Sequence, residues 1–271
     1  MIREPRSYKL AFIDLDDTLL GPTKDIDRTN LRALTRLRKA GVQIAIASGR
    51  HHRNITGLRE IGRQEWVLSS HGSVVRHEQT GEVLAEETIT PSLVDRLCAR
   101  ARELGFSLIV YHRDGAFIEH ESEWTDLYAR NAGWMPNRAD FHTLDPAGFQ
   151  KVLWSDHSDR IRQWAPKLKT EFADQLNVLV TNPELLEFFS VSANKAVGAQ
   201  TLARKLRIKA EDTLAFGDGS NDVELLRWAG FSVAMNHGQE SARQAARIVS
   251  PPGPPESAFA RAVNLTLSTA G

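Results

Sequence analysis

Two aspartates near the N-terminus, Asp14 and Asp16, have a spacing suited to nucleophilic or acid–base chemistry. They follow residues 9–13, a short apolar run that predicts a buried strand of a parallel sheet. Asp14 then lies at the carboxyl end of that strand, where open α/β sheets bind ligands. Paired carboxylates can offer a nucleophile and a proton donor, with a divalent cation to offset their repulsion. The alternative is a solvated acidic turn, because aspartate is a common turn residue.

Three further predicted elements also end in polar side chains. They are a strand at 42–47, an amphipathic helix that begins at 195, and a strand at 213–216. The side chains at these ends that could take part in chemistry belong to Ser48, Arg50, Lys195, Asp218, Asn221 and Asp222. Together with the first strand, these ends supply carboxylates, a hydroxyl and two cations.

These segments resemble the four motifs of the haloacid dehalogenase superfamily, and specifically its Cof-like phosphatases. Residues 14–19 have the pattern Asp-x-Asp-x-Thr-Leu, and residues 217–222 have the pattern Gly-Asp-x-x-Asn-Asp. Ser48 matches the second-motif hydroxyl and Lys195 matches the third-motif lysine. Four motifs in the right order, each at the end of a predicted element, are far more specific than one motif alone.

The resemblance implies a role for each motif residue. Asp14 would attack phosphorus to form an aspartyl-phosphate, and Asp16 would act first as an acid and then as a base. Ser48 and Lys195 would contact the transferring phosphoryl group, whose transfer depends chiefly on positioning and positive charge. The implied cofactor is Mg²⁺, which prefers oxygen ligands. Its expected ligands are Asp14, Asp16 through its carbonyl, Asp218 and Asp222. The expected substrate-binding residues are Gly49, Arg50 and Asn221, and the alternative for Arg50 is that it caps a loop.

The order of apolar segments predicts an α/β core that is interrupted by an insertion. With the resemblance, it implies a Rossmann-like, doubly wound parallel-sheet core and an inserted α+β cap domain. Strand and helix patterns alternate over 8–69 and resume from 195 to about 250. Between them, a hairpin at 74–84 leads to two helix-then-two-strand patterns, which begin near 90 and 158. The resemblance implies a large cap between the second and third motifs. The expected bounds are 1–84 and 193–271 for the core and 85–192 for the cap.

Composition limits the classes of partner. The chain of 271 residues has 34 basic and 34 acidic residues, which gives no electrostatic case for nucleic acid or an anionic membrane. No apolar run is long enough to span a bilayer, and the N-terminus lacks the apolar stretch of a signal peptide. The single cysteine, Cys98, is expected to be a small core residue. We therefore expect a cytoplasmic protein that acts on a small-molecule phosphate ester, without nucleic-acid or membrane partners.

Substrate choice is expected to depend on the cap, whose closure would exclude water from the site. An aromatic side chain and an arginine could stack on a sugar and hold an anionic group. The candidates in the least regular stretch of the cap are Trp124, Tyr128, Trp134 and Arg138. The alternative is that the tryptophans are cap core, because large aromatic side chains are mostly buried.

Two histidines depart from the pattern of the family. Where relatives commonly have Asn-Gly-Ala after the third core strand, this chain has His71-Gly72-Ser73. Where they often have Gly-Asn-Ala, it has Asn236-His237-Gly238. Histidine keeps a hydrogen-bond donor and adds titration near neutral pH, whereas the alternative is variation at exposed loop ends. The adjacent His51 and His52 are expected to form a solvated helix start.

These observations favour a Mg²⁺-dependent phosphatase of small phosphorylated metabolites, with a sugar phosphate as the first substrate class. A phosphomutase would use the same aspartyl-phosphate but return the phosphoryl group to the substrate. A dehalogenase needs neither Asp16 nor a metal. A non-catalytic, sugar-phosphate-binding regulator should have lost catalytic carboxylates, and none is missing here.

Overall fold

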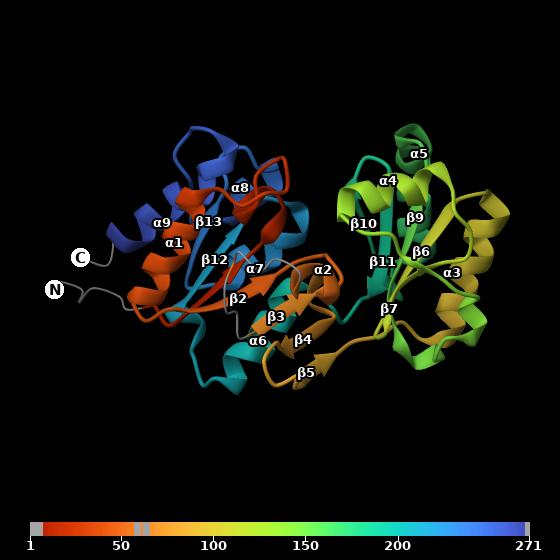
Figure 1. The fold of residues 1–271 in the computed structure, drawn as a ribbon, viewed down its shortest axis with the longest axis horizontal. Helices are drawn as coiled ribbons and strands as arrows, with labels where there is room; N and C mark the ends of the chain where they lie inside the picture. Colours follow the sequence, from red (N-terminus) through yellow and green to blue (C-terminus); the bar gives the residue numbers. More distant parts are fainter. Residues whose placement is uncertain (1–7, 57–60, 62–65, 269–271) are drawn as a thin grey trace. The chain divides into compact units, whose positions relative to one another are not determined.

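The structure is a computed structural model that describes residues 8–56, 61 and 66–268. Its contacts divide the chain into two compact units (Figure 1). The core unit comprises Met1–Gly49, Ile55–Ala85 and Asn194–Gly271, and the cap unit comprises Arg50–Asn54 and Glu86–Ala193. The chain enters the larger part of the cap unit after Ala85 and leaves it after Ala193, whereas the sequence-based bounds of the cap are 85–192. The grouping of Arg50–Asn54 with the cap unit was not expected.

An eight-stranded sheet forms the core unit, in the order β14-β13-β12-β1-β2-β3-β4-β5. The pairs from β14 to β3 are parallel, and β4 is antiparallel to β3. Successive strands run outward from β1 in one direction and from β12 in the other, so the strand order reverses between them. Open α/β sheets bind their ligands at such a point. The strands are β1 Leu10–Ile13, β2 Gln43–Ala47, β3 Trp66–Ser69, β4 Val74–His77, β5 Val83–Glu86, β12 Thr213–Gly217, β13 Phe231–Ala234 and β14 Ile248–Val249.

Helices cover both faces of this sheet. On one face, Leu34 and Phe259 share a buried cluster with Ile13. On the other face, Leu202 shares a buried cluster with Phe12. Because β1 is buried on both sides, its sequence is apolar throughout and the pattern predicted it correctly. The helices of the core are α1 Arg28–Lys39 and α9 Ala258–Ser268 on the first face, and α6 Lys195–Lys205, α7 Val223–Trp228 and α8 Glu240–Ala245 on the second.

The cap unit contains a six-stranded sheet in the order β10-β11-β9-β6-β7-β8. Its neighbouring strands are antiparallel except for β7 and β8. Helices α3 and α5 pack on one face, where Cys98 is buried, and α4 packs on the other. Helix α2 His52–Thr56 crosses a boundary between the two units. The other elements of the cap unit are α3 Pro91–Leu104, β6 Ser107–His112, β7 Gly115–Ile118, α4 Glu123–Ala132, β8 Asn137–Arg138, β9 Phe149–Ser155, α5 Ser158–Glu171, β10 Leu176–Asn182 and β11 Leu185–Ser190.

The predicted fold class, a doubly wound parallel-sheet core with an inserted α+β cap, is confirmed. Three elements of the cap, α4, β8 and β9, lie where no regular structure was expected. Strand β9 is fully buried but includes Gln150 and Lys151, which interrupt its apolar pattern. The buried charge of Lys151 is balanced by an ion pair with Glu187 on the neighbouring strand β11, whose Oε2 lies 2.7 Å from Nζ of Lys151. Among the helices that the structure describes, none has the length and apolar character needed to cross a membrane.

Candidate active site

The first two aspartates lie in different environments at the end of β1. Asp14 is 5% exposed, and its backbone N–H donates to the carbonyl of Phe216 at 3.0 Å, which continues the pairing of β1 with β12. The chain then turns over Leu15–Leu19, where the backbone of Asp16 and Asp17 is not helical. The side chain of Asp16 is 35% exposed and forms an ion pair with Lys24, whose Nζ lies 3.2 Å from Oδ1. Asp14 therefore faces the protein interior, whereas Asp16 is partly open to solvent.

Lys195 is fully buried at the first residue of α6. The side chain of Asn194 caps this helix by accepting from the N–H of Val197 at 2.8 Å. The Lys195 ammonium donates to Oδ1 of Asp14 at 2.5 Å and to Oδ1 of Asp222 at 2.6 Å. Burial by itself would lower the pKa of Lys195, but Asp14 and Asp222 together raise it above its usual value. The cation therefore stays protonated although it lies at a helix N-terminus, where the helix dipole disfavours it.

The turn that follows β12 completes an acidic cluster. Oδ2 of Asp222 accepts from the backbone N–H groups of Asp218 and Gly219, both at 3.0 Å. Oδ1 of Asp218 accepts from the Thr18 hydroxyl at 2.9 Å. One carboxylate oxygen from each of Asp14, Asp218 and Asp222 lies within 4.8 Å of the others. The point where the strand order reverses, between β1 and β12, thus brings Asp14 together with Asp218 and Asp222.

The electrostatics of this cluster fit a divalent cation. Burial raises the pKa of Asp14 well above its usual value, more than Lys195 lowers it, and the carboxylates of Asp222 and Asp218 add to the rise. Burial and then Asp222 raise the pKa of Asp218 to about 7. A bound cation would offset this repulsion, and Mg²⁺ prefers such oxygen ligands. The side chain of Asp16 is not part of the group.

Ser48, Gly49 and Asn221 are brought together around His71. Ser48 is buried, its N–H donates to the carbonyl of Leu68 at 2.8 Å, and its own carbonyl accepts from the N–H of His71 at 3.1 Å. His71 is 2% exposed, and its Nδ1 lies 3.3 Å from Nδ2 of Asn221. The alternative of an exposed loop end is therefore wrong for His71. His237 is exposed, and its Nε2 donates to the carbonyl of Asp17 at 2.7 Å.

Comparison with known proteins identifies the family. A family model described as haloacid dehalogenase-like hydrolase matches residues 11–257. The chain belongs to the haloacid dehalogenase-like hydrolases. It is 26% identical over 231 residues to a protein from Cronobacter sakazakii named HMP-PP phosphatase, with 84% of each chain covered. The predicted family and the hydrolase class are thus confirmed.

Solved structures agree with this assignment. A haloacid dehalogenase-like hydrolase from Bacteroides thetaiotaomicron is similar with a TM-score of 0.85 and 25% identity, covering 95% of this chain and 99% of that one. A sugar phosphatase of subclass IIB of the superfamily shares the fold, with a TM-score of 0.82 and 21% identity over 96% of this chain and 99% of that one.

Arg50 and His51 of this hydrolase lie in the segment that groups with the cap unit. His51 is 0% exposed: its Nε2 donates to the carbonyl of His112 at 2.9 Å, and its ring meets Tyr111 edge-on at 5.4 Å. Burial lowers the pKa of His51 to about 3, so the ring is neutral. The expected solvated helix start is therefore wrong at His51, because the segment packs into the cap unit.

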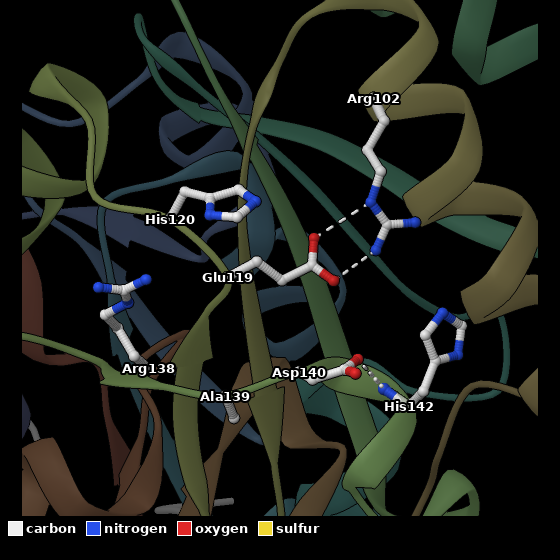
Figure 2. A pocket seen from close by; sticks show the side chains of 7 residues that line it. All are labelled: Arg102, Glu119, His120, Arg138, Ala139, Asp140 and His142. Carbon is white, nitrogen blue, oxygen red and sulfur yellow. Dashed lines mark hydrogen bonds and ion pairs between the residues drawn. The ribbon is translucent and has the colours of Figure 1, made fainter.

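The substrate-recognition candidates of the cap do not form one cluster. Tyr128 is buried, with its hydroxyl 2.7 Å from that of Tyr111. Trp124 is half-buried against His157, and Trp134 is half-buried beside the α4 face of the sheet. Arg138 is exposed in a hollow of about 530 Å³ on the cap unit (Figure 2). The hollow is lined by Arg102, Glu119, His120, Arg138, Ala139, Asp140 and His142.

Two side chains that contact the expected site residues, Thr18 and Lys24, had no predicted role. Thr18 belongs to the first motif, and its hydroxyl fixes Asp218. Lys24 lies between Asp16 and Asp17, with its Nζ within 3.3 Å of each carboxylate. The only sequence signal for Thr18 was its place in the motif. No sequence signal pointed to Lys24, because its ion pairs depend on the turn that brings residue 24 back toward residue 16.

Proposed function

We propose that this hydrolase is a Mg²⁺-dependent phosphatase of small phosphorylated metabolites, with sugar phosphates as the first class to test. The observation that carries the proposal is the buried cluster in which Lys195 joins Asp14 to Asp222, with Asp218 beside them. Such a cluster offers a nucleophile and positive charge at one edge of the sheet, which phosphoryl transfer requires. The names of the phosphatase relatives support the same reaction class.

In the proposed reaction, a carboxylate oxygen of Asp14 attacks phosphorus while the bond to the leaving oxygen breaks, and Asp16 gives that oxygen a proton. Asp16 then takes a proton from water as the water oxygen attacks phosphorus. The aspartyl-phosphate bond breaks, which releases phosphate and restores Asp14. Ser48 and Lys195 would hold the phosphoryl oxygens during both steps. Gly49, Arg50 and Asn221 would bind the substrate.

Asp14, Asp218 and Asp222, with the carbonyl of Asp16, would hold the Mg²⁺. When bound, the ion would supply positive charge to the phosphoryl oxygens. Both carboxylate oxygens of Asp222 already accept hydrogen bonds, one from Lys195 and one from the backbone of the turn. Asp222 would therefore also fix the positions of Lys195 and Asp218. The cytoplasmic location and the absence of nucleic-acid and membrane partners stay predictions from composition.

The test is phosphate release in Mg²⁺ from sugar phosphates, nucleotides, pyridoxal phosphate and HMP-PP. We expect wild type to hydrolyse at least one class and Asp14→Asn to fall to background, because an amide is a poor nucleophile and a weaker metal ligand. Asp17→Asn is the matched control, since its carboxylate lies outside the acidic cluster and pairs with Lys24. Substantial release by folded Asp14→Asn would contradict the proposal. Formation of an isomer instead of phosphate would favour a phosphomutase.

A further inference from the structure

The turn after β3 holds three consecutive residues in the left-handed backbone region. The φ angles are 49° at Ser70, 59° at His71 and 88° at Gly72. Gly72 is required, because a Cβ there would lie 2.4 Å from the carbonyl oxygen of Asn194. Histidine, like asparagine, is several-fold enriched among the non-glycine residues that adopt this conformation. The turn therefore fixes the direction of the His71 side chain relative to the start of α6.

The imidazole of His71 occupies the space beside Gly49. A Cβ on Gly49 would lie 2.4 Å from Cε1 of His71, so only glycine allows this approach. The His71 N–H also donates to the carbonyl of Ser48 at 3.1 Å. Backbone and ring thus both hold His71 against the turn that follows β2.

On its other side, the imidazole meets Asn221 in the turn that follows β12. Nδ1 of His71 lies 3.3 Å from the Asn221 amide nitrogen, which donates to it when the ring proton is on Nε2. The amide oxygen of Asn221 points toward Gly219, where a Cβ would lie 2.7 Å away. His71 therefore sets the orientation of the Asn221 amide.

We propose that His71 is a positioning residue of the phosphate site, which holds the Asn221 amide at a fixed place relative to the Ser48–Gly49 turn. This inference rests on the proposed function, because Ser48, Gly49 and Asn221 are the residues assigned there to the phosphate ester. The side chain bridges two turns that come from different strands, and it is nearly fully buried. Loss of its acceptor would free the Asn221 amide to rotate and weaken the binding of a phosphoryl group.

Two substitutions of His71 test the hydrogen-bond acceptor of its side chain without changing the left-handed backbone conformation. Both asparagine and glycine fit a left-handed residue, so His71→Asn and His71→Gly avoid the strain that other residues would add. The Oδ1 atom of asparagine can take the place of Nδ1 as an acceptor for Asn221, whereas glycine offers none. Asn221→Ala removes the other partner, and the double variant His71→Gly/Asn221→Ala completes a thermodynamic cycle. His77→Ala is the control, because that ring packs on Trp66 in β3.

The experiment measures the Kd of inorganic phosphate by calorimetry in Mg²⁺, and kcat and KM for p-nitrophenyl phosphate. We expect His71→Gly and Asn221→Ala each to weaken phosphate about tenfold, as the loss of one positioning hydrogen bond would. The double variant should also lose about tenfold rather than the hundredfold expected for independent sites. His71→Asn should recover most of the affinity, and KM should change more than kcat.

Three results would overturn the inference even if wild type releases phosphate from an ester. One is a Kd for phosphate in His71→Gly equal to that of wild type, and another is a loss in the double variant equal to the product of the two single losses. The third is a loss of phosphate affinity in His71→Asn as large as that in His71→Gly. If wild type binds phosphate but hydrolyses no ester, the proposed function fails, and the binding cycle still decides the role of His71. Absence of phosphate binding by wild type would overturn both.

Discussion

Lys195 shares its charge between two buried carboxylates, and it is the residue whose loss should affect every substrate alike. Lys195→Ala should lower kcat/KM by on the order of a hundredfold or more for each ester, because the proposed contact of its ammonium is with the phosphoryl group that all esters share. Lys205→Ala, on the same helix but in an exposed pair with Glu82, should leave the rates unchanged. The measurement is kcat/KM across a panel of esters. A loss that differs widely between esters would assign Lys195 to leaving-group recognition instead.

Substitution of Asp218 tests the Mg²⁺ requirement without removing the proposed nucleophile, Asp14. Asp218→Ala should sharply raise the Mg²⁺ concentration needed for half-maximal activity, because one of the clustered carboxylates is lost. A chelator should stop hydrolysis by wild type. Ca²⁺ should not restore it, since Ca²⁺ accepts more ligands in a looser geometry that misplaces Asp14. Asp212→Ala, at an exposed pair with Lys9, is the control. Full activity of wild type in chelator would favour metal-free chemistry.

At the scale of elements, the burial of His51 beside α2 should make the protein sensitive to acid. The unfolded chain binds a proton at this ring below pH of about 6.5, whereas the folded chain does so only near pH 3, so stability falls as pH falls between these values. From pH 7.5 to 5, wild type should lose about 2 kcal/mol more of its free energy of unfolding than His51→Gln, whose amide can still donate to His112. Urea unfolding of both proteins at each pH measures this difference. Equal losses would show that folding does not lower the pKa of His51.

The sequence predicted those elements whose pattern depends on local burial. The core strands β1, β2, β3 and β12 are continuous apolar runs because both of their faces are covered. Helix α4 was missed although Ser122 and Thr125 form a capping box at its start, because its half-buried face gives a weak apolar pattern.

For the site too, local features could be predicted from the sequence, whereas contacts between distant residues could not. Asp14, Lys195 and Asp218 could be selected from the sequence because their types and their places at element ends are visible in the motifs, and the structure brings them together. The contact between His71 and Asn221 could not be predicted, because it joins residues 150 positions apart through a turn whose backbone conformation no periodic pattern encodes.

At the scale of the whole molecule, the acidic cluster lies in the core unit, whereas Arg138 lies in the cap unit. If the cap recognises the leaving group, Arg138→Ala should change the ranking of natural esters by kcat/KM. Hydrolysis of p-nitrophenyl phosphate should be nearly unchanged, because this small ester is held mainly through its phosphoryl group. Arg130→Ala, at an exposed position of α4, is the control. A uniform loss on all esters, or an unchanged ranking, would show that Arg138 does not take part in recognition.

The chain passes between the two units four times, after Gly49, Asn54, Ala85 and Ala193, whereas one continuous insertion would pass twice. Transplanting residues 86–193 from a relative as one piece would therefore leave His51 without the partners it has in His112 and Tyr111. A working chimera would need the donor's version of Arg50–Asn54 as well. That short segment begins two residues after Ser48, so exchanging the whole cap unit also changes the sequence beside the second motif.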